Sequence, residues 1–502
     1  HDPRCRYNAY KFTASGVRKH PQYWSCIDPG TNTFSADSRT YLNFENTDPT
    51  DPPLTDIAAH DCAAQFGTSL ASLDAAVVEA YEPGAPGPEP PTPAEIAAIC
   101  ESWTQQPNQI NRAALQFNCP QLSHYNLFED STDPRSGARE GGTRFELTTQ
   151  LFSDYALKYR FVFLPPDQQA TWHEGSAAAP NATLGFPVGT VIAKTFAFPN
   201  GANEEVVETR LLIHRDSPTG PYWEGMAFIW DEDGSGNRTD AHLAIAGGTA
   251  SVAWNYQDPD PDVDVGGTYA GSTNSYLIPH AQQCGTCHIN DDKDPGDSPI
   301  GAKVRLLNRP MDYGSGPENQ LQHWIDAGLI SGAPALTVDG TSQIATNVQR
   351  LPRFNVTADT VANHGANIPA SEPARLAQMT AAEIDEELRV RGFIETNCAH
   401  CHNRDGLAQS TGVFFDTFRR VNLNYGICKS PTTAGSSSGG RNFDIVPGSA
   451  NDSIVSFRVH STDASAQMPP IARSVSHNEA VGLLDDWIDN VVDGEYEGAG
   501  CE

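Results

Sequence analysis

Close to its C-terminal end the chain reads Cys398-Ala-His-Cys401-His402, and an earlier stretch, Cys284-Gly-Thr-Cys287-His288, has the same C-x-x-C-H spacing. Two thiols separated by two residues can form thioethers with the two vinyl groups of one porphyrin, and the histidine that follows can bind the iron. With 11 Cys and 15 His in 502 residues, chance predicts only about 0.007 such motifs. The motifs therefore predict two covalently attached haem c groups, with His288 and His402 as the proximal iron ligands.

Two other uses of paired cysteines compete with haem attachment. The two pairs could together hold a structural zinc ion, but a zinc site would not require a histidine after each pair. A redox-active dithiol of the thioredoxin type needs a strand–helix–strand setting, which the surrounding sequence lacks. Haem attachment is the interpretation that accounts for both histidines.

The sequence around the second motif predicts a helical module. Thr380-Ala-Ala-Glu383 is a capping box that opens a helix leading to the motif, and Ser476 with Glu479 forms another that opens the last helix. Met468, in a Met-Pro-Pro turn, lies between the motif and that last helix. This order is typical of a class I cytochrome c domain. Met468 is therefore the predicted sixth ligand of the second iron, and a core-filling methionine is the alternative.

The sixth ligand of the first iron is less clearly marked. A strand-like run, Tyr276-Leu-Ile-Pro279, precedes the first motif, and Leu321-Gln-His-Trp-Ile-Asp326 after it resembles Leu484-Asp-Asp-Trp-Ile-Asp489 in the last helix. This weak repeat indicates two related modules. His323 within the repeat and Met311 before it are the candidate ligands. An iron bound by neither would keep an open position for peroxide or oxygen.

The chain is expected to be a multidomain α+β protein. Residues 1–142 form a disulfide-bearing N-terminal region with five cysteines, and residues 143–279 form an antiparallel β-rich domain. Residues 280–378 and 379–502 are expected as two helical cytochrome c-like modules. The β-rich assignment rests on short alternating runs separated by turn signals, at 159–164, 190–198, 206–213, 226–230 and 250–256.

Three further local predictions concern the first half of the chain. Helices are expected over residues 57–81 and from Thr92-Pro93-Ala94-Glu95, a capping box with proline at the first helical position. The acidic run 231–237 resembles a calcium loop, but His242 stands where that loop needs an acidic twelfth residue. We expect this run to be the tip of a β-hairpin.

Charge and hydropathy exclude two classes of partner. The chain has 32 Lys and Arg against 63 Asp and Glu, a net charge of −31. Such an acidic surface repels phosphate backbones, so no nucleic-acid partner is expected. No stretch reaches the ~18–20 apolar residues that a membrane span needs. The charge favours solubility and cationic partners, and general solvation of the surface accounts for it without a specific cationic partner.

The remaining cysteines indicate the compartment. Seven of the 11 cysteines lie outside the two motifs, and scattered cysteines in a large acidic chain suggest disulfides formed in an oxidising space. Because seven is odd, one thiol is free or pairs between two chains. The polar start His1-Asp-Pro-Arg4 is interpreted as the beginning of a mature chain whose export signal has been removed. The expected location is periplasmic or extracellular.

A series of segments also carries a family resemblance. They are Leu151-Phe-Ser-Asp-Tyr155, Phe186-Pro-Val-Gly-Thr190, Glu208-Thr-Arg-Leu-Leu212, Leu277-Ile-Pro279, Asn319-Gln-Leu-Gln-His-Trp324, Asn397-Cys-Ala-His-Cys-His402, Asp444-Ile-Val-Pro-Gly448 and Met468-Pro-Pro470. Over residues 151–492 they make the chain similar to a bacterial family of dihaem c-type cytochromes without an assigned function, often encoded beside a parallel β-helix repeat protein. The resemblance implies two covalent haems and export, but no substrate.

The expected function is that of an exported electron carrier. Electrons would pass between the two haems and a redox partner protein or an extracellular acceptor, with no bond chemistry at either iron. Two rivals stay open. One is a dihaem peroxidase or oxygenase whose first iron has an open face. The other is a subunit that self-associates into an extracellular electron-conducting filament.

Overall fold

The structure, a computed structural model, describes residues 91–175, 182–217, 220–259, 267–288, 299–355, 377–432, 434–492 and 501, together with the backbone of four short strands before residue 27. The chain divides into two units, 1–91 and 92–502. In the first unit, β1 (Cys5–Arg6) pairs with β4 (Ser25–Cys26), and β2 (Tyr10–Thr13) pairs with β3 (Gly16–Lys19), both antiparallel. The helix expected over 57–81 lies outside the described residues.

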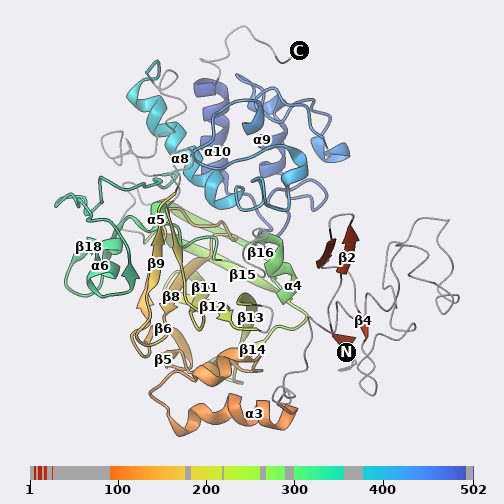
Figure 1. The fold of residues 1–502 in the computed structure, drawn as a ribbon. Helices are drawn as coiled ribbons and strands as arrows, with labels where there is room; N and C mark the ends of the chain where they lie inside the picture. The colour runs from red at the N-terminus through yellow and green to blue at the C-terminus, as the bar shows by residue number, and fades with distance from the viewer. Residues whose placement is uncertain are drawn as a thin grey trace, which may run out of the picture. The chain divides into compact units, whose positions relative to one another are not determined.

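An eight-stranded sheet dominates the second unit (Figure 1). Its strands run in the order β14-β13-β12-β11-β15-β16, while β8 pairs with β11 and β7 with β8. All pairings are antiparallel except one between Asn200 of β11 and Asn255 of β15. The antiparallel β-rich region and its predicted runs are confirmed. The strands are β7 (Thr143–Arg144), β8 (Leu157–Phe163), β11 (Val191–Asn200), β12 (Asn203–Arg215), β13 (Tyr222–Glu232), β14 (Arg238–Leu243), β15 (Gly248–Gln257) and β16 (Thr268–Ile278).

The acidic run between β13 and β14 is a hairpin tip, as predicted. The Asp233 carboxylate accepts hydrogen bonds from the backbone N–H groups of Ser235 (2.8 Å) and Asn237 (3.0 Å). Such an Asx turn closes the loop with the aspartate's own side chain. These bonds hold the pKa of Asp233 below its ordinary value.

One face of the sheet is covered by the segment that precedes it. Helix α3 (Pro93–Glu101) opens with the predicted capping box, in which Thr92 and Glu95 exchange hydrogen bonds. Three 3-10 helices follow and complete an apolar core that contains Met226 and Phe228 of β13. The Cys100–Cys119 disulfide is buried in the same core. The 3-10 helices are η3 (Ser102–Gln105), η4 (Arg112–Gln116) and η5 (Leu122–Tyr125).

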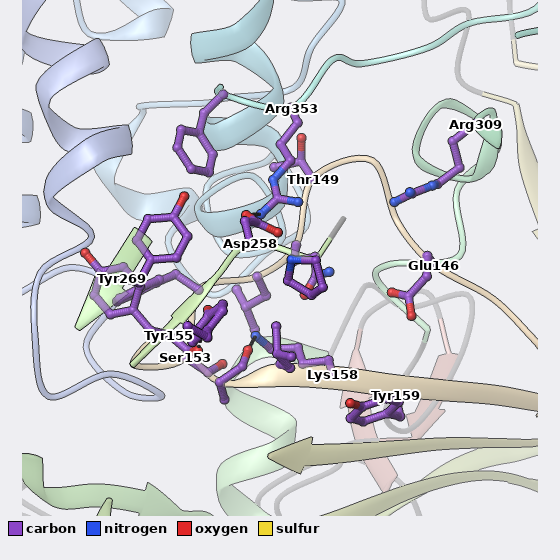
Figure 2. A pocket seen from close by; sticks show the side chains of 18 of the residues that line it. Glu146, Thr149, Ser153, Tyr155, Lys158, Tyr159, Asp258, Tyr269, Arg309 and Arg353 are labelled. Atoms are coloured by element: carbon purple, nitrogen blue, oxygen red, sulfur yellow. Dashed lines mark hydrogen bonds and ion pairs between the residues drawn. The ribbon is translucent and has the colours of Figure 1, made fainter. Parts of the chain in front are cut away.

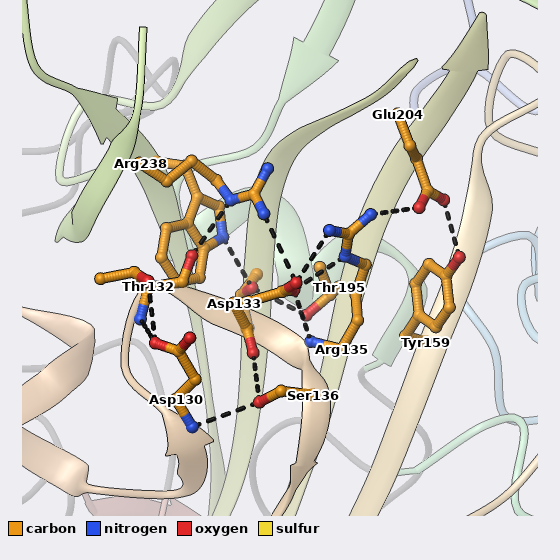
Figure 3. A network of polar contacts seen from close by, with 11 residues as sticks. Asp130, Thr132, Asp133, Arg135, Ser136, Tyr159, Thr195, Glu204 and Arg238 are labelled. Carbon is orange, nitrogen blue, oxygen red and sulfur yellow. Dashed lines mark hydrogen bonds and ion pairs between the residues drawn. The ribbon is translucent and has the colours of Figure 1, made fainter. Parts of the chain in front are cut away.

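A polar network fixes the hairpin of β5 (Phe128–Asp130) and β6 (Asp133–Ala138) to this region (Figure 3). Arg135 forms ion pairs with Asp133 (2.7 Å) and with Glu204 of β12. Tyr159 of β8 donates a hydrogen bond to the same Glu204 carboxylate (2.7 Å). The Arg238 guanidinium of β14 lies 3.7 Å from Asp133. These contacts hold the hairpin to β12 and β14, and Tyr159 of β8 binds the same Glu204 carboxylate.

The segment after the first motif shares a core with the other face of the sheet. Leu307 and Trp324 pack with Leu212 and Trp223 of the sheet in one apolar cluster. Strand β19 (Ile330–Ser331) also extends a small sheet of order β10-β9-β19. The other elements here are β9 (Ala170–His173), β10 (Thr183–Gly185), α5 (Val304–Leu307), β17 (Pro310–Asp312), β18 (Pro317–Asn319) and α6 (Gln320–Asp326).

The C-terminal part packs its helices around a separate apolar core, in which Phe393, Tyr425 and Trp487 are buried. Helix α8 (Ala381–Asn397) starts with the predicted capping box of Thr380 and Glu383. Helix α10 packs against both α8 and α9 (Figure 1). The remaining elements are η7 (Gln409–Thr411), η8 (Leu423–Tyr425), η9 (Gly435–Ser438), η10 (Ala450–Asp452), α9 (Ile454–His460), α10 (Asn478–Asp486) and the π-helix η11 (Trp487–Val492).

The capping box predicted for the last helix is wrong, although the helix itself is confirmed. His477 is the N-cap of α10, and it makes no capping hydrogen bond with its side chain. The Ser476 hydroxyl donates to the Val459 carbonyl (3.3 Å), and the Glu479 carboxylate accepts from the Tyr155 hydroxyl (2.7 Å). Both side chains that would form the box are thus engaged by tertiary partners.

Within the described part of the chain, no helix combines the length and the apolar character that crossing a bilayer requires.

Candidate functional site

The first motif lies on a helix. Strand β16 ends at Ile278, two residues follow, and helix α4 (Ala281–His288) then carries Cys284, Cys287 and His288. This confirms the strand-like run before the motif. Helix α4 packs against β13, so the motif is held against the central sheet.

The second motif forms the turn that ends helix α8. Cys398 is the C-cap, and its carbonyl accepts hydrogen bonds from the N–H groups of Cys401 (3.1 Å) and His402 (2.9 Å). The Nδ1 atom of His402 lies 3.2 Å from the Val413 carbonyl. A metal-binding histidine commonly donates one ring N–H to such a carbonyl and keeps the other nitrogen for the metal. Burial lowers the pKa of His402 to about 4, which keeps the imidazole neutral and able to bind a metal at neutral pH.

The structure brings the two motifs into contact. The Cys401 thiol lies 3.4 Å from the Thr286 carbonyl of the first motif. The sulfur atoms of Cys287 and Cys401 and a ring nitrogen of His400 all lie within 4.8 Å of one another. Cys284, Cys287, Cys398 and Cys401 are not joined in disulfides, whereas Cys100 pairs with Cys119 and Cys428 with Cys501.

Each motif lines its own cavity. The first cavity contains Cys284, Cys287 and His288, and the second contains Cys398, Cys401 and His402. Cys287 lines both cavities, so they share a wall. Apolar side chains also line each of them: Phe145, Leu147, Leu151, Ile192 and Leu212 in the first, and Val413, Phe415, Ile454 and Val459 in the second.

Met468 lines the second cavity together with His402. Its position depends on Arg473, a buried residue (6% exposed) whose guanidinium donates to the Met468 carbonyl (2.8 Å) and to the Ser461 carbonyl (2.8 Å). The Met468 N–H in turn donates to the Arg458 carbonyl (2.9 Å). The thioether of the Met-Pro-Pro turn is thus fixed through its backbone, and the two predicted ligands of the second iron share one cavity.

The two candidate ligands of the first iron lie elsewhere. His323 of α6 stacks on Tyr313, with ring centroids 3.6 Å apart, and its Nδ1 lies 3.0 Å from the Glu318 carboxylate. Met311 of β17 lines a different cavity. Neither residue lines the first cavity. Their role as sixth ligand stays a prediction that this geometry does not support.

Four basic side chains line the first cavity, and the sequence reasoning did not identify them. They are Lys158 and Arg160 of β8, Lys194 of β11 and Arg210 of β12. Burial lowers the pKa of Lys194 to about 7, with further lowering by the positive charges of Arg210 and Arg160. One sequence pattern does mark such residues: basic residues stand at alternate positions within otherwise apolar strands, as in Leu157-Lys-Tyr-Arg-Phe161.

A third cavity of about 380 Å³ lies between β8 and the C-terminal part. Figure 2 shows its lining, in which Arg353 lies beside Asp258. These two side chains form an ion pair (2.5 Å). Tyr155 and Tyr269 add aromatic surface. Lys158 lines this cavity as well as the first, so the two are neighbours.

Comparison of the chain with family models, curated proteins and solved structures finds no match.

The donor sets fit covalent haem. Each motif supplies two cysteine thiols and one imidazole to the lining of its cavity, as thioether attachment and iron binding require. In the second cavity, a partly buried neutral imidazole and a thioether sulfur are both present. In the first cavity, the histidine is present and a second iron ligand is not evident among the predicted candidates.

Proposed function

We propose that the chain is a dihaem c-type cytochrome that transfers electrons between two covalently bound haems and a redox partner. One observation carries the proposal: each C-x-x-C-H motif lines its own cavity, and Cys287 lines both. Haem iron, when bound, supplies reversible one-electron chemistry. The chain's part is to hold the two groups beside each other and to set the surroundings of each iron.

The residues have distinct roles in this proposal. Cys284, Cys287, Cys398 and Cys401 hold the two porphyrins. His288 and His402 are the proximal ligands, and Met468 is the sixth ligand of the second haem. The C-terminal part, with its helix–motif–Met–helix order, is the class I cytochrome c-like module, and the segment after residue 280 is a divergent counterpart that shares its core with the sheet.

We also propose that the chain belongs to the bacterial family of dihaem c-type cytochromes that it resembles. Its proposed location is periplasmic or extracellular, after export. Two disulfides support an oxidising compartment. The net charge of −31 suits a redox partner with a cationic docking face.

Haem content tests the proposal directly. The protein, produced in a host that attaches haem c, should keep two haems per chain after denaturation, as measured by the pyridine haemochrome spectrum. The variants Cys284→Ala/Cys287→Ala and Cys398→Ala/Cys401→Ala should each keep one. The matched control, Cys100→Ser/Cys119→Ser, should keep both. A protein that carries no covalent haem, and instead binds one metal ion through Cys287, His400 and Cys401, would overturn the proposal.

A second candidate function is favoured by one observation: neither His323 nor Met311 lines the first cavity. A first iron with an open face would make the protein a dihaem peroxidase or oxygenase. Carbon monoxide distinguishes the two, because it binds only a reduced iron with an available position. An electron carrier should show no carbon monoxide shift at either haem, whereas a shift at one haem that is lost in Cys284→Ala/Cys287→Ala would establish the enzyme.

A further inference from the structure

The basic side chains of the first cavity form a row across three neighbouring strands. Lys194 of β11 lies directly opposite Arg160 of β8 on one side and Arg210 of β12 on the other. Lys158 lies two residues before Arg160 in β8, and its side chain is therefore on the same face of the sheet as that of Arg160. Side chains directly opposite each other in an antiparallel pair are close neighbours, and like charges in such positions destabilise the sheet. The repulsion between these cations therefore destabilises the sheet, and a bound anion would offset that repulsion.

The acidic partners of the row account for only part of its charge. Glu146 pairs with Arg160 (2.8 Å), and the fully buried Glu208 pairs with Arg210 (2.5 Å). The lysines differ from these arginines. The Lys158 ammonium group donates to the Ala156 carbonyl (3.1 Å), and both lysines lie near the Phe196 ring. Among the described residues, no carboxylate lines the first cavity. Two positive charges are left in excess when both lysines are protonated.

Two members of the row, Lys158 and Arg160, are buried, whereas Lys194 and Arg210 are partly buried. Lys158 is 6% exposed and Arg160 is 3% exposed. Buried charges are normally paired. Burial and the mutual repulsion of the four cations lower the pKa of Lys158 well below its ordinary value. A pair of carboxylates delivered into the cavity would reverse this effect on both lysines.

We infer that the row binds two carboxylates, the propionates of the haem attached to Cys284 and Cys287. Lys158 and Lys194 are the residues that pair with them, since Arg160 and Arg210 already have acidic partners. The charge count agrees, because a haem carries two propionates and the row has two cations in excess. This inference rests on the proposed function. It also assigns the sheet a role: its cations raise the reduction potential of the first haem by opposing the extra positive charge of the oxidised iron.

Reduction potentials of the two-haem protein test the inference. We expect Lys194→Met and Lys158→Met each to lower the potential of the first haem, shifting its reduction equilibrium about tenfold, or 59 mV for one electron. The second haem should change less. The reduction potential of the second haem is measured on its own in Cys284→Ala/Cys287→Ala, which lacks the first haem. Lys194→Arg should restore the wild-type potential. Arg238→Gln, which removes a cation from the same sheet outside the cavity, should leave both potentials unchanged.

Several results would contradict the inference. Two attached haems with unchanged potentials in both methionine variants would overturn it while leaving the proposed function intact, whereas the absence of covalent haem would defeat the proposed function itself. A change in the low-spin electron paramagnetic resonance signal of the first haem in Lys194→Met would mean that the amine binds the iron. A potential that shifts with inorganic phosphate in the wild type but not in Lys194→Met would mean that the row binds solvent anions. Where Lys194→Met does not accumulate, Lys194→Gln provides the same readout.

Discussion

At the scale of single residues, Met468 illustrates how a flexible side chain is placed by its backbone. Methionine has three rotatable bonds and adapts to irregular spaces, so its own packing specifies its position poorly. Here the carbonyl of Met468 accepts from Arg473 and its N–H donates to the Arg458 carbonyl. These bonds fix the backbone from which the Met468 side chain extends, on the wall of the cavity that His402 also lines.

Replacing Met468 with alanine tests its role as a ligand. Met468→Ala should lower the reduction potential of the second haem and allow the reduced iron to bind carbon monoxide, because a thioether ligand raises the potential and occupies the sixth position. Both changes are read by optical titration. Met379→Ala, at a partly buried methionine that packs on the same apolar core, is the matched control and should show neither. Carbon monoxide binding that is equal in the two variants would show that Met468 is a core residue.

At the scale of elements, a buried ion cluster joins α8 to the segment around α5. Glu395 of α8 contacts Lys303 (2.7 Å) and Arg305, and the Thr417 hydroxyl and N–H donate to the same carboxylate. Burial alone would raise the pKa of Glu395, but the charges of Arg305 and Lys303 hold it well below its ordinary value of 4.5. This cluster connects the part of the chain that follows the first motif to the helix that leads into the second.

Glu395→Gln should destabilise the protein and flatten its pH dependence. At pH 7 the loss should be about 3–5 kcal/mol, because the buried Arg305 and the partly buried Lys303 would lose their anion. A carboxyl whose pKa is lowered by folding stabilises the native state above its unfolded pKa and loses that contribution as the pH falls. The wild type should therefore lose more stability than Glu395→Gln between pH 7 and pH 3, measured by urea unfolding. Glu386→Gln on the same helix is the control, because burial raises the pKa of Glu386. A variant as stable as the wild type at pH 7 would contradict this account.

Elements were predictable from the sequence where local signals decide them. The capping boxes at Thr92 and Thr380 have partners three residues away, and both are confirmed. The Ser476–Glu479 box has the same spacing, but Tyr155 lies 324 residues from Glu479 and takes its carboxylate. Tertiary partners of this kind leave no local signal.

At the scale of the whole molecule, the candidate site combines parts that differ in how far the sequence reveals them. The C-x-x-C-H motifs are contiguous, so both proposed attachment sites could be found by spacing alone. The basic row is assembled from β8, β11 and β12, and its cations become neighbours only through the register that sets Lys194 opposite Arg160 and Arg210. The contact between the motifs likewise depends on α8 ending beside α4, which no periodicity encodes.

The two described disulfides of the second unit stabilise different cores, and their removal should reveal this. Cys428–Cys501 closes a separation of 73 residues over the C-terminal core, whereas Cys100–Cys119 closes 19 residues in the core on the sheet. In the chain-entropy model the longer loop contributes about 4 kcal/mol and the shorter about 3 kcal/mol. Cys428→Ser/Cys501→Ser should therefore lower the urea midpoint more than Cys100→Ser/Cys119→Ser, as followed by far-ultraviolet circular dichroism. It should also make the proposed bond between Met468 and the second haem the first to break during unfolding, because Met468 belongs to the C-terminal part. Loss of that bond at the same urea concentration in both double variants would show that the two cores unfold as one unit.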